Sequence, residues 1–251
     1  MKVNHLTDYI LHLADNTLIL AQRNSEWCAH GPILEQDIAI TNISLDLIGQ
    51  ARNFYQYAAQ LKVDGSTEDS LAYGRDVREY KNCLLAEQPN GDWAQTMVRQ
   101  FLFSAYQQLL YEQLQHSKDE QLAAIAAKAL KEVNYHLRWS SEWVIRLGDG
   151  TGESHNRMIN AIDVIWAYTG ELFIPIGYEA VAASDGIGVD VTALKNKWEE
   201  KVTAIFTEAT LSYPGKTFQQ LGGKTGLHSE HLGFILADLQ FMQRAYPNSE
   251  W

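Results

Sequence analysis

Long stretches without a helix-breaking residue are the feature of this sequence that most constrains its fold. The stretch from Ile33 to about Leu61 contains no proline and one internal glycine, Gly49. At about 1.5 Å per residue it would form a helix roughly 40 Å long. Such a helix is long for a globular protein and is typical of a helical bundle.

Apolar spacing predicts three further long helices. Residues at three- and four-residue intervals run from Leu6 towards Trp27, and similar stretches run from Trp93 to His116 and from Glu120 to Leu147. Shorter helical segments are expected near 75–87, 155–183, 192–211 and 227–246, with Pro175 interrupting the second. No alternating β-branched segments with hairpin turns occur. We predict an all-α fold over a single domain, residues 1–251, in which a four-helix bundle carries additional C-terminal helices.

Three local signals predict where helices begin. Asp92 followed by Gln95, and Ser117 followed by Glu120, have the spacing of capping boxes. Pro32 is suited to the first position of the second long helix.

Composition excludes several kinds of partner. The 251 residues include 31 acidic and 20 basic side chains, which gives a formal charge of −11. Binding to nucleic acid or to an anionic membrane requires clustered lysine and arginine. No segment is apolar enough to span a bilayer, and the N-terminus lacks the apolar core of a signal peptide. The two cysteines form no CxxC pair and fit a reducing compartment. We expect a cytoplasmic protein that binds neither nucleic acid nor membrane.

Familiar nucleotide and nucleophile motifs are incomplete. Gly222-Gly223-Lys224-Thr225 resembles the end of a phosphate-binding loop, but Phe218 occupies the position of the required first glycine. We therefore predict a helix-entry loop there. The sequence also contains no G-x-S-x-G elbow.

A long helical bundle raises the question of a di-iron centre, which requires Glu-x-x-His on two helices and a further Glu on each of the other two. None of the eight histidines follows an acidic residue at that spacing. The pattern closest to the motif is Glu132 with His136, which stands four positions after the glutamate instead of three. On the second long helix Asp46 is an acidic residue with Gly49 where the ligand histidine would stand. We interpret Asp46, Glu132 and His136 as candidates for a degenerate site that holds no metal and forms a polar network or faces a partner. His228 and His231 are predicted to cap and hydrogen-bond at a helix start.

Four separated motifs carry a family resemblance. They are "LDLIGQAR" at 45–52, "EQPNGDWA" at 87–94, "KEVNYHLRW" at 131–139 and "GGKTGLHSEHLG" at 222–233. In this order and spacing, from about residue 5 to Trp251, the chain resembles the C subunits of bacterial phenylacetyl-CoA epoxidases.

This resemblance implies both a fold and a role. The C subunits are ferritin-like and are regarded as structural, while the A subunit holds the di-iron centre, binds the thioester substrate and pairs with C. A smaller B subunit and a flavin/iron–sulfur reductase complete a system that converts phenylacetyl-CoA and dioxygen to a ring-1,2-epoxide. The resemblance carries no catalytic residue and no cofactor to this chain, and it implies the A subunit, and possibly the B subunit, as partners.

Three hypotheses follow. The first is a non-catalytic subunit that stabilises the catalytic one. The second is an enzyme, a ferritin-like metal-containing oxygenase whose non-standard ligands include Asp46, Glu132 and His136. The third is a homo-oligomeric helical binding protein with an apolar cavity.

Overall fold

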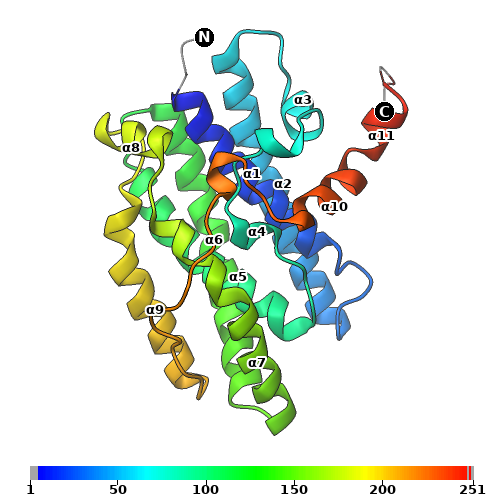
Figure 1. The fold of residues 1–251 in the computed structure, drawn as a ribbon, viewed down its shortest axis with the longest axis vertical. Coiled ribbons are helices and arrows are strands. Elements are labelled where there is room, and N and C mark those ends of the chain that lie inside the picture. Colours follow the sequence, from blue (N-terminus) through cyan, green and yellow to red (C-terminus); the bar gives the residue numbers. More distant parts are fainter. Residues whose placement is uncertain (1–4, 248, 250–251) are drawn as a thin grey trace. The chain divides into compact units, whose positions relative to one another are not determined.

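A computed structural model of the chain describes residues 5–247 and 249. Within these residues it contains eleven α-helices, five short 3-10 helices and no strand, so the predicted all-α class is confirmed (Figure 1). None of the described helices is long and apolar enough to cross a membrane. The chain divides into two compact units, Met1–Gln88 with Gly222–Trp251, and Pro89–Leu221. The expectation of a single domain stays a prediction.

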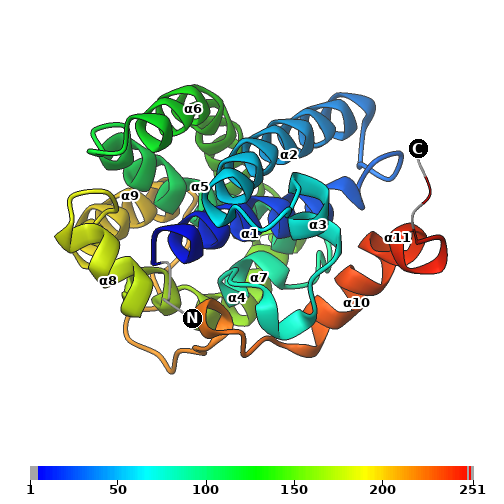
Figure 2. The ribbon, with the colours of Figure 1, turned by 90° about the horizontal axis from the view of Figure 1, so that it is seen from above.

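The first unit is built on a pair of long helices. Its elements are α1 (His5–Ser25), α2 (Leu34–Lys62), α3 (Glu68–Tyr73), η1 (Val77–Glu79), α4 (Leu84–Glu87), η5 (Gly223–Thr225), α10 (Glu230–Leu239) and α11 (Phe241–Ala245). α1 and α2 lie side by side as an antiparallel hairpin (Figure 2). α4 and α10 also contact α1, which is buried around most of its circumference.

The second unit repeats this plan with a different set of additional helices. Its elements are α5 (Trp93–Leu114), α6 (Glu120–Gly148), α7 (Gly152–Ile165), η2 (Trp166–Tyr168), η3 (Gly170–Phe173), α8 (Gly177–Ser184), η4 (Val191–Leu194) and α9 (Lys195–Glu208). α5 is the central helix and is contacted by α6, α7 and α9. The four long helices predicted from the sequence are therefore α1, α2, α5 and α6.

The helix predicted near 75–87 is not continuous, because tertiary contacts hold residues 80–83 in non-helical backbone between two short helices. Only η1 and α4 are helical there. Side chains of α1 take over the backbone hydrogen bonds of the segment. Lys81 N–H donates to Asp15, the carbonyl of Lys81 lies 2.7 Å from Nδ1 of His12, and Cys83 N–H donates to Asn16 at 2.8 Å. Backbone groups satisfied in this way have no need of helical partners.

Helix starts follow the predicted signals in part. Asp92 caps α5 by accepting from Gln95 N–H at 3.0 Å, as predicted. α6 is capped by Asp119, whose side chain accepts from Leu122 N–H at 2.9 Å, so the prediction for Ser117 is wrong. α2 begins after Ile33, which places Pro32 before the cap and outside the first turn.

Other boundaries differ because the chain turns sharply between helices. The segment predicted near 155–183 ends as α7 at Ile165 and resumes as α8, with Pro175 in the non-helical stretch between them. In the C-terminal segment Gly223 and Gly226 pack closely on residues 78–84. A β-carbon at Gly223 would overlap the backbone of Asn82 and Leu84, and Gly226 has φ of 83°. Only glycine permits this approach.

Candidate functional site

The three predicted site residues lie in different parts of the structure. Asp46 is a partly exposed residue of α2 in the first unit. Glu132 and His136 lie one turn apart on α6 in the second unit, where Glu132 is partly exposed and His136 is fully buried. Within one unit the structure therefore brings together only Glu132 and His136.

Several buried amide, hydroxyl and phenol groups of α5 are hydrogen-bonded to one another, and one of them, Tyr111, is affected by the charge of Glu132. On α5, Gln107 Nε2 donates to the Tyr111 hydroxyl at 3.1 Å, and Gln100 Nε2 donates to the Ser104 hydroxyl at 2.8 Å. Burial raises the pKa of Tyr111, the hydrogen bond from Gln107 opposes this, and the charge of Glu132 raises the pKa further. The phenol of Tyr111 therefore stays protonated, and the hydrogen bonds of these α5 side chains join neutral groups.

The residues present do not fit a di-iron centre. Nowhere in residues 5–247 or at 249 does the structure bring together three or more His, Cys, Asp or Glu residues that could hold a metal ion. Tyr135, three residues after Glu132 where a ligand histidine would stand, is 38% exposed. No chemical step can be assigned to a metal bound by these side chains, and the absence of a metal in this chain stays a prediction.

An electrostatic cluster that the sequence analysis missed is buried in the first unit. The side chain of Asp15 on α1 is fully buried. Its two oxygens accept from both terminal nitrogens of Arg75, one of them at 3.1 Å, from the Tyr55 hydroxyl at 2.5 Å and from Lys81 N–H at 2.8 Å. The guanidinium also lies over the ring of Tyr80, 4.2 Å from its centroid.

The electrostatics of this cluster favour the charged form of Arg75 and the protonated form of Tyr55. Burial lowers the pKa of Arg75, but the charge of Asp15 more than offsets that effect and the net pKa is raised. Burial and the charge of Asp15 raise the pKa of Tyr55, so the hydroxyl remains a donor to the carboxylate. The result is a buried ion pair with hydrogen bonds on both oxygens of the carboxylate, which is the arrangement that makes burial of charge tolerable.

A second buried ion pair joins the C-terminal segment to α4. Nδ1 of His228 lies 2.8 Å from Oε2 of Glu87, and both side chains are 0% exposed. Oε1 of the same carboxylate accepts from the backbone N–H and the hydroxyl of Ser229 at 2.7 and 2.8 Å. Nε2 of His228 lies 2.9 Å from the carbonyl oxygen of Tyr80. His228 is thus an ion-pair partner, and the cap residue of α10 is Ser229.

Both ring nitrogens of His228 therefore face acceptors, a carboxylate and a carbonyl. Only the doubly protonated imidazolium can donate to both. Burial lowers the pKa of His228, but the hydrogen bond and charge of Glu87 outweigh it, and the net pKa is raised. The ring of His12 has different neighbours, since its Nε2 lies 3.2 Å from the amide nitrogen of Asn16, which is a donor.

These two clusters are structural, because their donors and acceptors are satisfied by one another. The first cluster fastens Arg75 and Lys81 to α1, and the second fastens residues 228–229 to Tyr80 and Glu87. A sequence signal for the second was present, since Glu87 opens one motif of the family resemblance and His228 lies in another. Nothing in the sequence indicated that the two motifs would touch.

α2 exposes a stripe of apolar side chains along one face. Leu34, Ile38, Leu45 and Ile48 are 72%, 52%, 59% and 41% exposed, and Thr41 completes the alternation of four- and three-residue steps. That alternation is the a/d pattern by which one helix packs against another. We call these five residues the α2 stripe. The opposite side of α2 is buried and includes Ile40, Leu47 and Phe54.

The stripe continues into a small depression on the same unit. A cavity of about 250 Å³ is lined by Ile48 together with Leu18, Ala51, Arg52, Tyr55, Glu68, Asp69, Ala72 and Tyr73. An apolar stripe that ends in a recess offers a partner both a helix-packing seam and a hole for an anchoring side chain. This surface is the candidate functional site.

Comparison with known proteins places the chain in a family. A family model described as phenylacetic acid catabolic protein matches residues 1–251. The C subunit of the 1,2-phenylacetyl-CoA epoxidase of Escherichia coli (strain K12) is 49% identical to this chain over 249 residues. The similarity covers 99% of this chain and 100% of that relative.

Proposed function

The chain belongs to the family of phenylacetic acid catabolic proteins, and we propose that it is the structural C subunit of a phenylacetyl-CoA epoxidase that works in phenylacetate catabolism. The family resemblance predicted from the four motifs is confirmed by the full-length match. In this proposal the reaction takes place on a di-iron catalytic A subunit, and this chain pairs with that subunit and stabilises it. The ferritin-like fold is part of the proposal and is supported by the two long hairpins, α1–α2 and α5–α6.

The observation that carries the proposal is the α2 stripe. Four large aliphatic side chains in an a/d pattern on the surface of a long helix are costly in water, and their burial would contribute roughly 25 cal/mol per Å². Because similarity to a C subunit implies further subunits, the occupant to which the proposal commits is a helix of the catalytic partner. An obligate contact of this kind buries upwards of about 2,000 Å².

The stabilising effect follows from mass action. A chain that binds only the folded catalytic partner stabilises it by RT ln(1 + [L]/Kd), about 2.7 kcal/mol when its free concentration is 100 times Kd. In this proposal the buried ion pairs of the first unit fix the segments around α1, and α1 in turn supports α2, which packs against it.

Co-purification tests the docking face. A tagged catalytic subunit should retain the wild-type chain and lose Leu45→Glu, because a buried carboxylate in an apolar seam is strongly unfavourable. Val164→Glu is the matched control, since Val164 is a 51% exposed residue of α7 and is not part of the stripe. Equal retention of both variants would show that α2 is not the docking face.

Activity tests the structural role separately. We expect the catalytic subunit expressed without this chain to be unstable and to turn over phenylacetyl-CoA poorly. Full stability and full activity of that subunit alone would contradict the proposal. Stoichiometric iron in this chain purified alone would instead favour a metal-containing oxygenase.

A further inference from the structure

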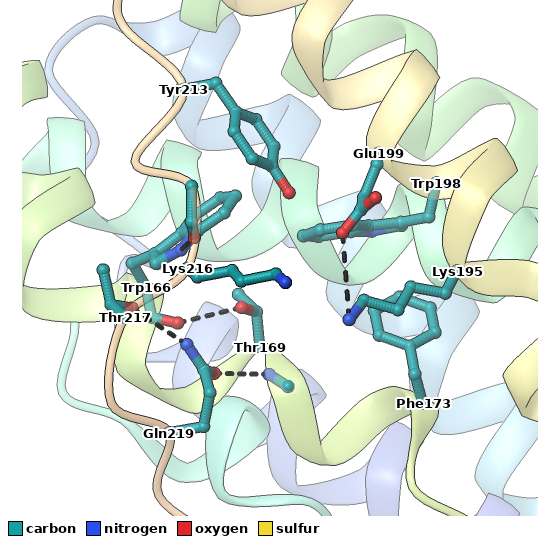
Figure 3. A pocket seen from close by; sticks show the side chains of 12 residues that line it. Trp166, Thr169, Phe173, Lys195, Trp198, Glu199, Tyr213, Lys216, Thr217 and Gln219 are labelled. Carbon is teal, nitrogen blue, oxygen red and sulfur yellow. Dashed lines mark hydrogen bonds and ion pairs between the residues drawn. The ribbon is translucent and has the colours of Figure 1, made fainter.

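A separate cavity lies wholly within the second unit. It has a volume of about 480 Å³ and is bounded by η2, η3, α9 and the loop that follows α9 (Figure 3). This volume falls in the range of about 300–1,000 Å³ that small-molecule sites occupy.

The floor of the cavity is aromatic and buried. Trp166, Phe173 and Trp198 are 4%, 6% and 2% exposed. The ring centroids of Trp166 and Trp198 lie 5.8 Å apart, those of Phe173 and Trp198 lie 5.1 Å apart, and Tyr213 meets Trp166 edge-on at 4.9 Å. Both indole N–H groups are already used, by the carbonyls of Gly215 and Leu102. The floor therefore offers ring faces and edges, and no indole donor, to a ligand.

One wall is a preformed polar structure. Oε1 of Gln219 accepts from Gly170 N–H at 2.6 Å, and its Nε2 donates to the Thr217 hydroxyl at 3.1 Å. A β-carbon at Gly170 would overlap the Gln219 side chain, so glycine is required for this contact. These hydrogen bonds fix the loop at the edge of the cavity.

The rim is cationic, which is unusual for a chain of charge −11. Lys195 and Lys216 point their ammonium groups into the same space from opposite sides, and the Tyr213 hydroxyl points into it from above (Figure 3). Glu199 is the carboxylate among the described lining residues and lies 3.9 Å from Nζ of Lys195. Burial and the adjacent Glu199 raise the pKa of Tyr213 to about 12, so its hydroxyl is a donor at neutral pH. The two ammonium groups and the one carboxylate together give the rim of the cavity a net charge of +1.

We propose that this cavity binds an aromatic monocarboxylate, with its ring on Trp166, Phe173 and Trp198 and its carboxylate between Lys195 and Lys216. A single negative charge neutralises the rim, and a flat ring matches the aromatic floor in the offset or edge-on contacts that such rings favour. This inference does not depend on the proposed structural role, because the cavity and the α2 stripe lie in different units.

Titration of the full-length chain with phenylacetate tests the proposal. Two of the seven tryptophans line the cavity, so binding should change the intrinsic fluorescence saturably, and calorimetry should give one site per chain. Acetate, which has the charge without the ring, and phenylacetamide, which has the ring without the charge, should each bind at least about tenfold more weakly. Tenfold corresponds to about 1.4 kcal/mol.

Variants locate the site. Lys216→Gln should weaken phenylacetate binding about tenfold, whereas Lys197→Gln, an exposed lysine on the same helix as Lys195 and outside the cavity, should leave it unchanged. Because Lys216 is an exposed loop residue, its replacement should not impair folding. The absence of saturable phenylacetate binding at millimolar concentration would overturn the proposal. Equal affinity for phenylacetamide, or equal weakening by both lysine variants, would do so as well.

Discussion

The carboxylate of Glu87 lies 2.8 Å from Nδ1 of His228, although the two residues are 141 positions apart in the chain. The contact joins the end of α4 to the segment that precedes α10, within the first unit. Because the second nitrogen of His228 faces a carbonyl oxygen, the pair is complete only while the imidazole is protonated. This makes the attachment of the C-terminal segment dependent on pH.

We predict that the stabilisation due to His228 declines as pH rises. Its pKa in the folded chain is raised above the ordinary value of about 6.5. The folded state therefore binds the proton more tightly, and the contribution is fully present below about pH 6.5 and is lost as pH passes the folded-state pKa. Urea unfolding between pH 6 and 9 should show the stability gap between wild type and His228→Gln narrowing. His30→Gln, at an exposed position, should show a small gap at every pH. A gap for His228→Gln that is constant with pH would contradict the imidazolium.

Removing one partner of the Asp15–Arg75 pair should be strongly destabilising. Asp15→Ala leaves the buried guanidinium of Arg75 without its carboxylate, and such changes cost about 3–5 kcal/mol. The free energy of unfolding from urea titration provides the measurement. Arg157→Ala breaks an exposed pair with Glu153 and should have a much smaller effect, since water screens that pair. Comparable losses of unfolding free energy from the two variants would show that the buried pair stabilises the chain no more than an exposed pair does.

Neighbouring leucines of α2 should behave in opposite ways. Leu47 is 0% exposed and Leu45 is 59% exposed. Leu47→Ala should cost about 2–5 kcal/mol of stability through the cavity it leaves. Leu45→Ala should change the stability of the isolated chain by less than about 0.5 kcal/mol but weaken its affinity for the catalytic subunit. Measuring unfolding and binding of both variants would separate the core side of α2 from its docking side. If Leu45→Ala lost stability and Leu47→Ala did not, Leu45 would belong to the core side.

Chelation should leave the chain unaltered. Because Asp46, Glu132 and His136 do not form a ligand cluster, EDTA should not shift the unfolding midpoint, and Glu132→Gln should not change metal content. The Glu132→Gln variant should instead lower the pKa of Tyr111, since it removes a charge that raises it. The pKa can be followed by tyrosinate absorbance at alkaline pH. Loss of bound iron or manganese in Glu132→Gln would support the oxygenase hypothesis.

The sequence predicted the local structure well and the site poorly. The four long helices could be predicted from apolar spacing and from the lack of helix-breaking residues, because a turn of 3.6 residues places residues three and four positions apart on one face. The cap at Asp92 was also predictable locally, because a capping side chain accepts from the backbone N–H three residues further along the chain. The break in the helix predicted near 75–87 was missed, because side chains of α1 at positions 12, 15 and 16 satisfy backbone groups of Lys81 and Cys83.

Local pattern thus determined the helices of this protein, its all-α class and the motifs that reveal its family. Tertiary structure alone decided which acidic residues are buried, since Asp15 meets Arg75 across 60 positions and Glu87 meets His228 across 141. It also decided which face of α2 remains exposed and which aromatic rings of the second unit surround a cavity. Spacing along a chain specifies which residues share a helix face. Whether that face meets water, a charge or another helix depends on segments distant in sequence, whose positions only the folded chain defines.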